Sequence, residues 1–245
     1  MNIRKLYICI GINSLLILLG FFFYFTFRFG FDPTRMFVIV SVISILLLGV
    51  VIFSTIRYKK TNNNTVYQVA DWCSFLAISL ILITSILNFF VMPARVIGDS
   101  MNNTLYDGDF VITYHFNYTP KVNDVCAIFI DKDANDKDVN YVKRIAAVPG
   151  DDISIKPAGF GVEFHIYIND KLYLEDKTIN IDQWKTIVSN FQSSLLEEFK
   201  IPEGYYLAFG DNWGNSTDSR SKGLFPLEHI RGKVFFRIKP FGAIK

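Results

Sequence analysis

One serine and one lysine in the polar part of this chain could work together as a nucleophile and its base. Ser100 lies in the turn-rich stretch 96–105, which begins just after a long apolar run. Lys143 lies in the stretch 141–151, whose first half has the pattern of a strand. A serine nucleophile needs a base to take its proton, and that base need not be histidine. We therefore interpret Ser100 and Lys143 as such a pair.

Other ways of building a catalytic site have less support. His115, His165 and His229 have no partner motif, which favours packing or surface roles and argues against a Ser-His-Asp triad. Two of the three cysteines lie in apolar runs and only Cys126 lies in the polar part, so no disulfide can form there. No Cys/His spacing is typical of zinc, and we expect neither a metal nor an organic cofactor.

Taken one at a time, these residues have ordinary interpretations. A lone serine in a turn is usually exposed to solvent, and a lone lysine in a strand usually points to water. Asp218 and Arg220 stand two apart, so on a strand they would share a face and could simply form a salt bridge. Only the joint pattern of Ser100, Lys143 and the polar stretch 210–220 favours catalysis.

Three apolar runs precede this polar part, at residues 6–27, 36–56 and 72–92. Each is long enough to cross a bilayer, which takes roughly 20 helical residues. Buried core helices are the alternative, but three nearly uncharged runs leave no polar face for water. The first run could be a cleaved signal peptide, yet no small-residue cleavage site ends it. We expect a retained three-helix anchor.

The charges flanking the three runs predict the orientation of the chain in the membrane. With the N-terminus inside, the inner side holds five Lys/Arg residues and the outer side holds only Arg28 and Arg35. Because basic loops stay on the cytoplasmic side, everything after the third run is expected outside the cell membrane. The net charge of +2 shows no basic stripe, so nucleic acid is not an expected partner.

The remainder of the chain reads as short strands and turns. We expect strands at residues 110–114, 125–130, 141–148, 165–168, 172–174, 205–209 and 232–238, a charged loop at 132–138, and weak helical periodicity over 184–200. The predicted domains are an anchor at residues 1–93 and a mostly β domain at 94–245, with an inserted lobe at about 154–202. A folded sheet or barrel-like body is the expected architecture.

Three stretches in this β part resemble the type I signal peptidases, membrane-bound serine proteases with a Ser–Lys dyad. The family's nucleophile pattern, Ser-Met-x-Pro-Thr-Leu, stands here as Ser100-Met-Asn-Asn-Thr-Leu105, followed by Gly-Asp. The stretch 141–151 resembles the lysine box and 210–220 the last box. Three boxes in the family's order are specific. One departure is Asn103, which replaces the family proline and its fixed φ angle.

The resemblance implies a role for each site residue. Ser100 would be the nucleophile and Lys143 the base, with Ser216 orienting the lysine. Gly98 is typical of the Gram-positive subgroup, whose oxyanion would depend on backbone N–H groups such as that of Ser100. Asp218 and Arg220 would form a supporting pair near the dyad. Candidates for the substrate pocket are Ile97, Met101 and Tyr141.

The expected function is removal of signal peptides from exported preproteins at the outer face of the cytoplasmic membrane. Signal peptides and the lipid bilayer are the expected partners. A catalytically inactive membrane-anchored relative that binds peptides or assists surface-protein assembly is the alternative, which Asn103 and Gly98 support. A self-cleaving Ser–Lys regulator is a third hypothesis, against which the three apolar runs and the lack of a DNA-binding motif count.

Overall fold

A computed structural model gives the structure of this protein. It divides into two compact units, Met1–Met92 and Pro93–Lys245. The charged loop expected at 132–138 lies almost wholly outside the described residues. These are residues 3–26, 34–132, 138–159, 162–189, 191, 198–239 and 241–244.

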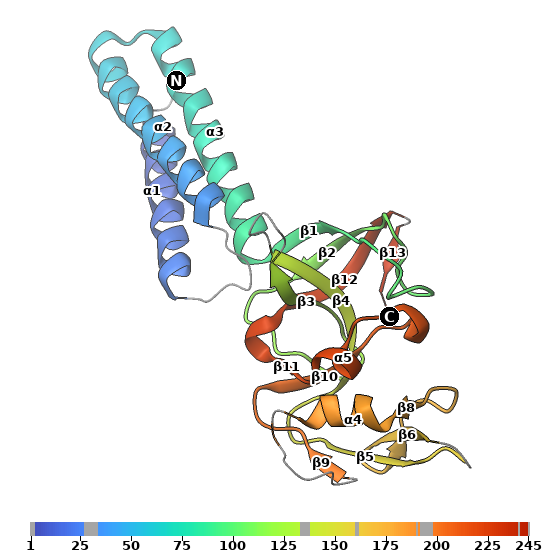
Figure 1. Ribbon diagram of the computed structural model, residues 1–245. Coiled ribbons are helices and arrows are strands. Elements are labelled where there is room, and N and C mark those ends of the chain that lie inside the picture. The colour runs from blue at the N-terminus through green and yellow to red at the C-terminus, as the bar shows by residue number, and fades with distance from the viewer. Residues whose placement is uncertain are drawn as a thin grey trace. The chain divides into compact units, whose positions relative to one another are not determined.

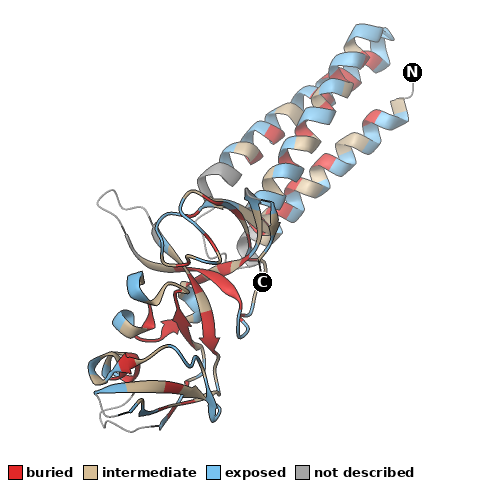
Figure 2. Ribbon diagram, turned by 90° about the vertical axis from the view of Figure 1, so that its right-hand side faces the viewer, coloured by how far each residue is buried: buried red, intermediate tan, exposed pale blue. Residues whose placement is uncertain are grey.

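The first unit consists of three long apolar helices that pack side by side (Figure 1). Many of their apolar side chains are exposed (Figure 2), as lipid-facing surfaces require. By length and composition each helix could cross a membrane, which confirms the prediction of three apolar N-terminal helices. The helices are α1 (Ile3–Thr26), α2 (Thr34–Thr61) and α3 (Asn64–Phe89), with candidate spans Ile3–Phe23, Val38–Thr61 and Asn64–Leu87.

Helix α3 differs from its prediction at residues 72–92, which was wrong at both ends. The side chain of Asn63 accepts a backbone N–H of the first turn, so the helix begins at Asn64. Its first two turns mix the polar residues Asn64, Thr65 and Gln68 with apolar ones, so they are not marked by a continuous apolar run. At the other end, Pro93 disfavours helical backbone in the residue before it. The chain therefore leaves the helix and forms strand β1 (Val91–Arg95).

The second unit contains a long sheet with strand order β1-β2-β12-β3-β4-β10-β11, and β13 pairs with β12. Its register places Cys126 opposite Lys143 and Arg144 opposite Phe209, the last residue of β10. The chain that follows β10 therefore starts beside the lysine. The strands are β2 (Phe110–Tyr114), β3 (Val125–Lys132), β4 (Asp138–Ala147), β10 (Tyr205–Phe209), β11 (Phe225–Pro226), β12 (Ile230–Lys239) and β13 (Gly242–Ala243).

A smaller sheet is inserted between β4 and β10, with strand order β7-β6-β5-β9, and β8 pairs with β6. A hydrophobic cluster that includes Ile153 and Trp184 of this insertion also contains Leu207 and Phe209 of β10, so the two sheets share a core. The strands of the insertion are β5 (Asp152–Pro157), β6 (Glu163–Ile168), β7 (Lys171–Leu172), β8 (Ile179–Asn180) and β9 (Glu198–Lys200).

The helical periodicity expected over 184–200 corresponds only partly to a helix. A capping box between Asn180 and Gln183 starts α4 (Ile181–Val188), which packs beside β5 and β6 in Figure 1. The later part of that prediction was wrong, because residues 198–200 pair with β5 as strand β9. The remaining short helices are η1 (Trp213–Asn215), α5 (Ser219–Lys222) and η2 (Leu227–His229).

Candidate active site

The side chains of Ser100 and Lys143 meet, although 43 positions separate them in the chain. The Nζ atom of Lys143 lies 2.7 Å from the Oγ atom of Ser100, and it also donates to the backbone oxygen of Val142 at 2.9 Å. Lys143 is 1% exposed, and its Nζ lies 5.1 Å from the ring centroid of Tyr141. A hydroxyl and an amine at this distance, with the amine shielded from water, can exchange a proton.

Burial lowers the pKa of Lys143 to about 8, because the ammonium form loses hydration. The carboxylates of Asp218 and Asp211 oppose this shift, whereas the guanidinium of Arg220 supports it. At pH 7 about a tenth of such a lysine is neutral, compared with less than about a thousandth of an exposed lysine. A lysine in this environment therefore has a neutral fraction near neutral pH that is able to accept a proton.

Two consecutive turns present Ser100. The N–H of Asn102 donates to the carbonyl of Asp99, and the N–H of Thr104 donates to that of Met101. Met101 is buried in a hydrophobic cluster that holds the turn to the sheet domain. Asn103 has a φ of +86°, a left-handed conformation that asparagine tolerates and proline cannot adopt. The turn at Asn103 therefore has a backbone conformation that a proline at this position would not allow.

The segment after β10, called the clamp below, forms hydrogen bonds with the turn that carries Ser100. The backbone N–H of Asn212 donates to the carbonyl of Ser100, and the Asn212 side chain donates to the carbonyl of Asp99, both at 3.0 Å. Gly210 lies so close that a Cβ atom there would overlap the carbonyl of Ser100 and the hydroxyl of Ser216. Glycine at this position lets the segment 210–220 pack closely against the turn that carries Ser100.

The structure shows the hydrogen-bonding surroundings of Ser216 and Gly98. The buried hydroxyl of Ser216 has no hydrogen-bond partner among the described residues, and Lys143 bonds to Ser100 and Val142 instead. An orienting role for Ser216 stays a prediction. The N–H of Gly98 donates to Asp107 at 2.9 Å, so it is not free for an oxyanion. Its φ of +88° also places strain on any side chain there.

Asp218 and Arg220 form a two-pronged salt bridge at 2.7 and 2.9 Å, with both side chains nearly buried. The expectation that they share the face of a strand was wrong, because Asp218 is the N-cap of α5. The same carboxylate accepts the N–H of Gly210 at 3.1 Å. Arg220 also lies 4.5 Å above the ring of Trp213. The pair thus fixes the clamp and places two opposite charges near Lys143.

Sequence reasoning missed a second charged pair, Arg144 with Asp211. Two nitrogens of Arg144 donate to the carboxylate of Asp211 at 2.8 and 2.9 Å, and one of them lies 3.2 Å from the hydroxyl of Thr104. The Thr104 hydroxyl in turn donates to Asp211. One residue from each of the three boxes meets here. The only sign of this contact in the sequence was that all three residues lie in stretches that resemble family motifs.

The three candidates for a substrate pocket have different surroundings. Ile97, which lies three residues before Ser100, is 87% exposed. Tyr141 is half-buried beside the amine of Lys143. Met101 is 1% exposed and packs in the core with Val96 and Leu105, so it has almost no surface to offer a ligand.

Comparison with known proteins places this arrangement in a family. Residues 69–239 match the family described as signal peptidase, peptidase S26, which covers more than half of the chain. The chain belongs to the signal peptidase family.

Curated relatives of similar length support the assignment to the signal peptidase family. Signal peptidase IB of Staphylococcus aureus is 31% identical over 73% of this chain and 93% of its own length. Signal peptidase I S of Bacillus subtilis is 30% identical over 76% of this chain and 98% of its own. A crystal structure of a signal peptidase I from Enterococcus faecalis is 20% identical and covers 48% of this chain and 97% of its own, with a TM-score of 0.28.

Substitutions of Asp218 and of Arg220 should shift the pKa of Lys143 in opposite directions. In Arg220→Gln, Asp218 loses its neutralising partner, so the pKa of Lys143 should rise and the rising limb of the pH–rate profile should move to higher pH. In Asp218→Asn the remaining guanidinium should move that limb to lower pH. We would measure kcat/KM against pH on a peptide substrate, with circular dichroism to confirm folding. Shifts in the same direction would contradict this electrostatic account.

The backbone of Asn103 yields a stability prediction. Asn103→Gly should be tolerated, because glycine adopts a φ of +86° without strain. Asn103→Pro should lower the free energy of unfolding by about 1–3 kcal/mol, because the ring cannot reach that angle. Urea unfolding of both variants, followed by tryptophan fluorescence, tests this. A proline variant as stable as the wild type would show that the turn adopts another conformation.

Proposed function

We propose that this chain is a membrane-anchored serine endopeptidase that removes signal peptides from exported preproteins, with Ser100 as nucleophile and Lys143 as general base. The observation that carries the proposal is the 2.7 Å contact between Nζ of a buried lysine and Oγ of Ser100. Family membership and the curated signal peptidases of staphylococcal and bacillar origin support the substrate class. No observation favours the inactive alternative over it.

The proposed reaction follows from the two side chains. The Oγ atom of Ser100 attacks the scissile carbonyl carbon while its proton passes to neutral Nζ of Lys143. The tetrahedral intermediate then expels the leaving amine, which takes that proton, and an ester remains on Ser100. Water loses a proton to Lys143 and attacks the ester, which releases the acid and restores the serine hydroxyl.

The oxyanion of the intermediate would be stabilised by the backbone N–H of Ser100. Among the described residues this N–H has no acceptor, whereas the N–H of Gly98 is bonded to Asp107. A single well-placed donor of this kind contributes roughly 10²–10³-fold to the rate. Gly98→Ser would add a hydroxyl only at the cost of strain at a φ of +88°.

The catalytic unit is proposed to lie on the extracytoplasmic side. Arg4 and Lys5 lie in the first turn of α1, and Arg57, Lys59 and Lys60 lie in the last turns of α2, at the two ends that the positive-inside rule assigns to the cytoplasm. α3 then returns the chain to the outer face. A mature preprotein emerges on that side, where an extended, small-residue cleavage segment could reach Ser100 beside exposed Ile97.

Substitution of the dyad tests the reaction. Ser100→Ala should abolish cleavage and leave the fold intact, because Ser100 lies in a turn outside the core. Lys143→Arg should also abolish it, because arginine stays charged and cannot act as the base. The assay is cleavage of a preprotein by detergent-solubilised protein, followed by gel mobility. A Lys143→Arg protein that cleaves at the wild-type rate would exclude lysine as the base.

The pH dependence tests the state of the base. Since only neutral Lys143 accepts the proton, kcat/KM of the wild type should rise with pH through about 8, the lowered pKa of this lysine. An exposed lysine would place this limb near pH ~10.4. A limb at that higher value would show that Lys143 is hydrated, or is not the base.

Orientation can be measured independently of activity. Protease added to intact protoplasts should degrade the unit that begins at Pro93, while a tag near Lys60 should stay protected until lysis. The reverse pattern would overturn the proposed topology.

A further inference from the structure

One acidic side chain lies within the three membrane helices. Asp71 on α3 is the only Asp or Glu in the ranges of α1, α2 and α3, and it pairs with Lys5 of α1 at 2.7 Å. Both side chains remain partly exposed, at 34% and 55%. Asp71 lies about two turns inside the candidate span Asn64–Leu87. A carboxylate there is costly unless it binds a cation, so this position is a candidate functional site.

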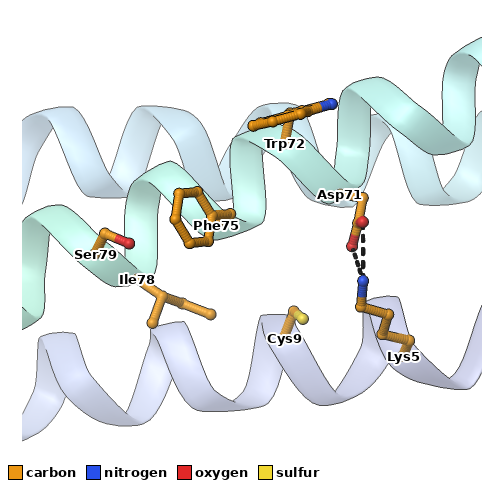
Figure 3. A pocket seen from close by; sticks show the side chains of 7 residues that line it. All are labelled: Lys5, Cys9, Asp71, Trp72, Phe75, Ile78 and Ser79. Carbon is orange, nitrogen blue, oxygen red and sulfur yellow. Dashed lines mark hydrogen bonds and ion pairs between the residues drawn. The ribbon is translucent and has the colours of Figure 1, made fainter.

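The ion pair stands at one end of a cavity between α1 and α3 (Figure 3). Cys9 and Ile78 lie along the cavity, and Ser79 lies at the end away from the ion pair. Its volume of about 490 Å³ is that of a small-molecule pocket, so it can take side chains of an apposed helix rather than the helix itself. The lining residues are Lys5, Cys9, Asp71, Trp72, Phe75, Ile78 and Ser79.

The exposed surface beside this cavity is suited to a further helix. Trp72 and Phe75 are 68% and 62% exposed and stand at helical spacing on α3. Small side chains such as Cys9 and Ser79 let another helix approach closely, which is how helices associate in membranes. From Asp71 to Ser79 the groove extends about 12 Å along the helix axis, the length of about eight helical residues.

α1 itself shows which pattern suits this groove. It starts with the basic pair Arg4-Lys5, continues as an apolar run, and packs on α3 with Lys5 on Asp71. A signal peptide has the same order, a positively charged start followed by 7–15 apolar residues. A bilayer phosphate, by contrast, would find the one lysine of the lining already paired with Asp71. The charge pattern therefore favours a basic, apolar peptide over a phospholipid.

We propose that the groove between α1 and α3 binds the apolar helix of the substrate's signal peptide, with a basic residue at its start on Asp71. This rests on the proposed function and on the orientation with Asp71 at the inner face, where that basic start also lies. Nζ of Lys5 contacts both oxygens of Asp71, at 2.7 and 2.9 Å, but the Asp71 side chain is 34% exposed and each oxygen has a further lone pair, so it can bind a second cation beside Lys5.

Two matched variants test the proposal. Both Asp71→Asn and Lys5→Gln break the ion pair, but only the first removes the carboxylate. For a preprotein, Asp71→Asn should raise KM about 5-fold, which corresponds to the loss of one exposed ion pair. Lys5→Gln should leave KM equal or lower, because Asp71 is then open to the substrate. Equal increases in both variants would mean that the pair only holds α1 to α3, and the proposal would be wrong.

The substrates provide the second comparison. The rise in KM for Asp71→Asn should shrink for a preprotein whose initial Lys/Arg residues are changed to Gln, and for a short peptide that spans only the cleavage site. The same rise for all three substrates would overturn the proposal. If wild-type protein cleaves neither the preprotein nor the peptide, the proposed function fails instead, which keeps the two failures distinguishable.

Cross-linking tests the groove without relying on turnover. Cys9 lines the cavity and is a free cysteine. In the Ser100→Ala protein, a preprotein with one cysteine in its apolar segment should form an oxidative cross-link that Cys9→Ser removes and Cys73→Ser retains. A cross-link that persists in Cys9→Ser, or no cross-link in membranes where the preprotein is bound, would place the signal peptide elsewhere and refute the groove.

Discussion

An amine can take a proton from a serine near neutral pH only where water does not hold it charged. The surroundings of Lys143 in the second unit meet this constraint. Lys143 is shielded by its place on a central strand, between β3 and β10. A buried cation would normally attract a carboxylate, which would restore its charge. Asp218 is close enough to do so, but the two-pronged bond to Arg220 offsets its charge.

Hydrogen bonds to the backbone then place the nucleophile against this shielded amine. The strand register fixes the lysine, and the segment after β10 fixes the serine through the carbonyls of Asp99 and Ser100. Arg144, Asp211 and Thr104 tie the same parts together a second time with side chains. Local sequence thus sets each part, while the distance between Oγ and Nζ depends on contacts between distant boxes.

The sequence predicted the three helices, most strands and the Ser100–Lys143 pair, because these follow from apolar runs, alternation and family motifs. It could not predict features set by tertiary contacts. The Arg144–Asp211 bond needs the pairing of β4 with β10. The early start of α3 depends on the cap by Asn63, which an apolar run does not reveal.

The clamp after β10 has a consequence for how this protein is made. Asn212 follows Ser100 by 112 positions, and strands β2 to β10 lie between them in the chain, so Ser100 is held in place by a segment made much later. Ribosomes add residues at about 5–20 per second. For several seconds the growing chain therefore contains both Ser100 and Lys143 without the segment that aligns them. The contact between Ser100 and Lys143 is therefore held by this segment only after the three apolar helices and the inserted sheet have been synthesised.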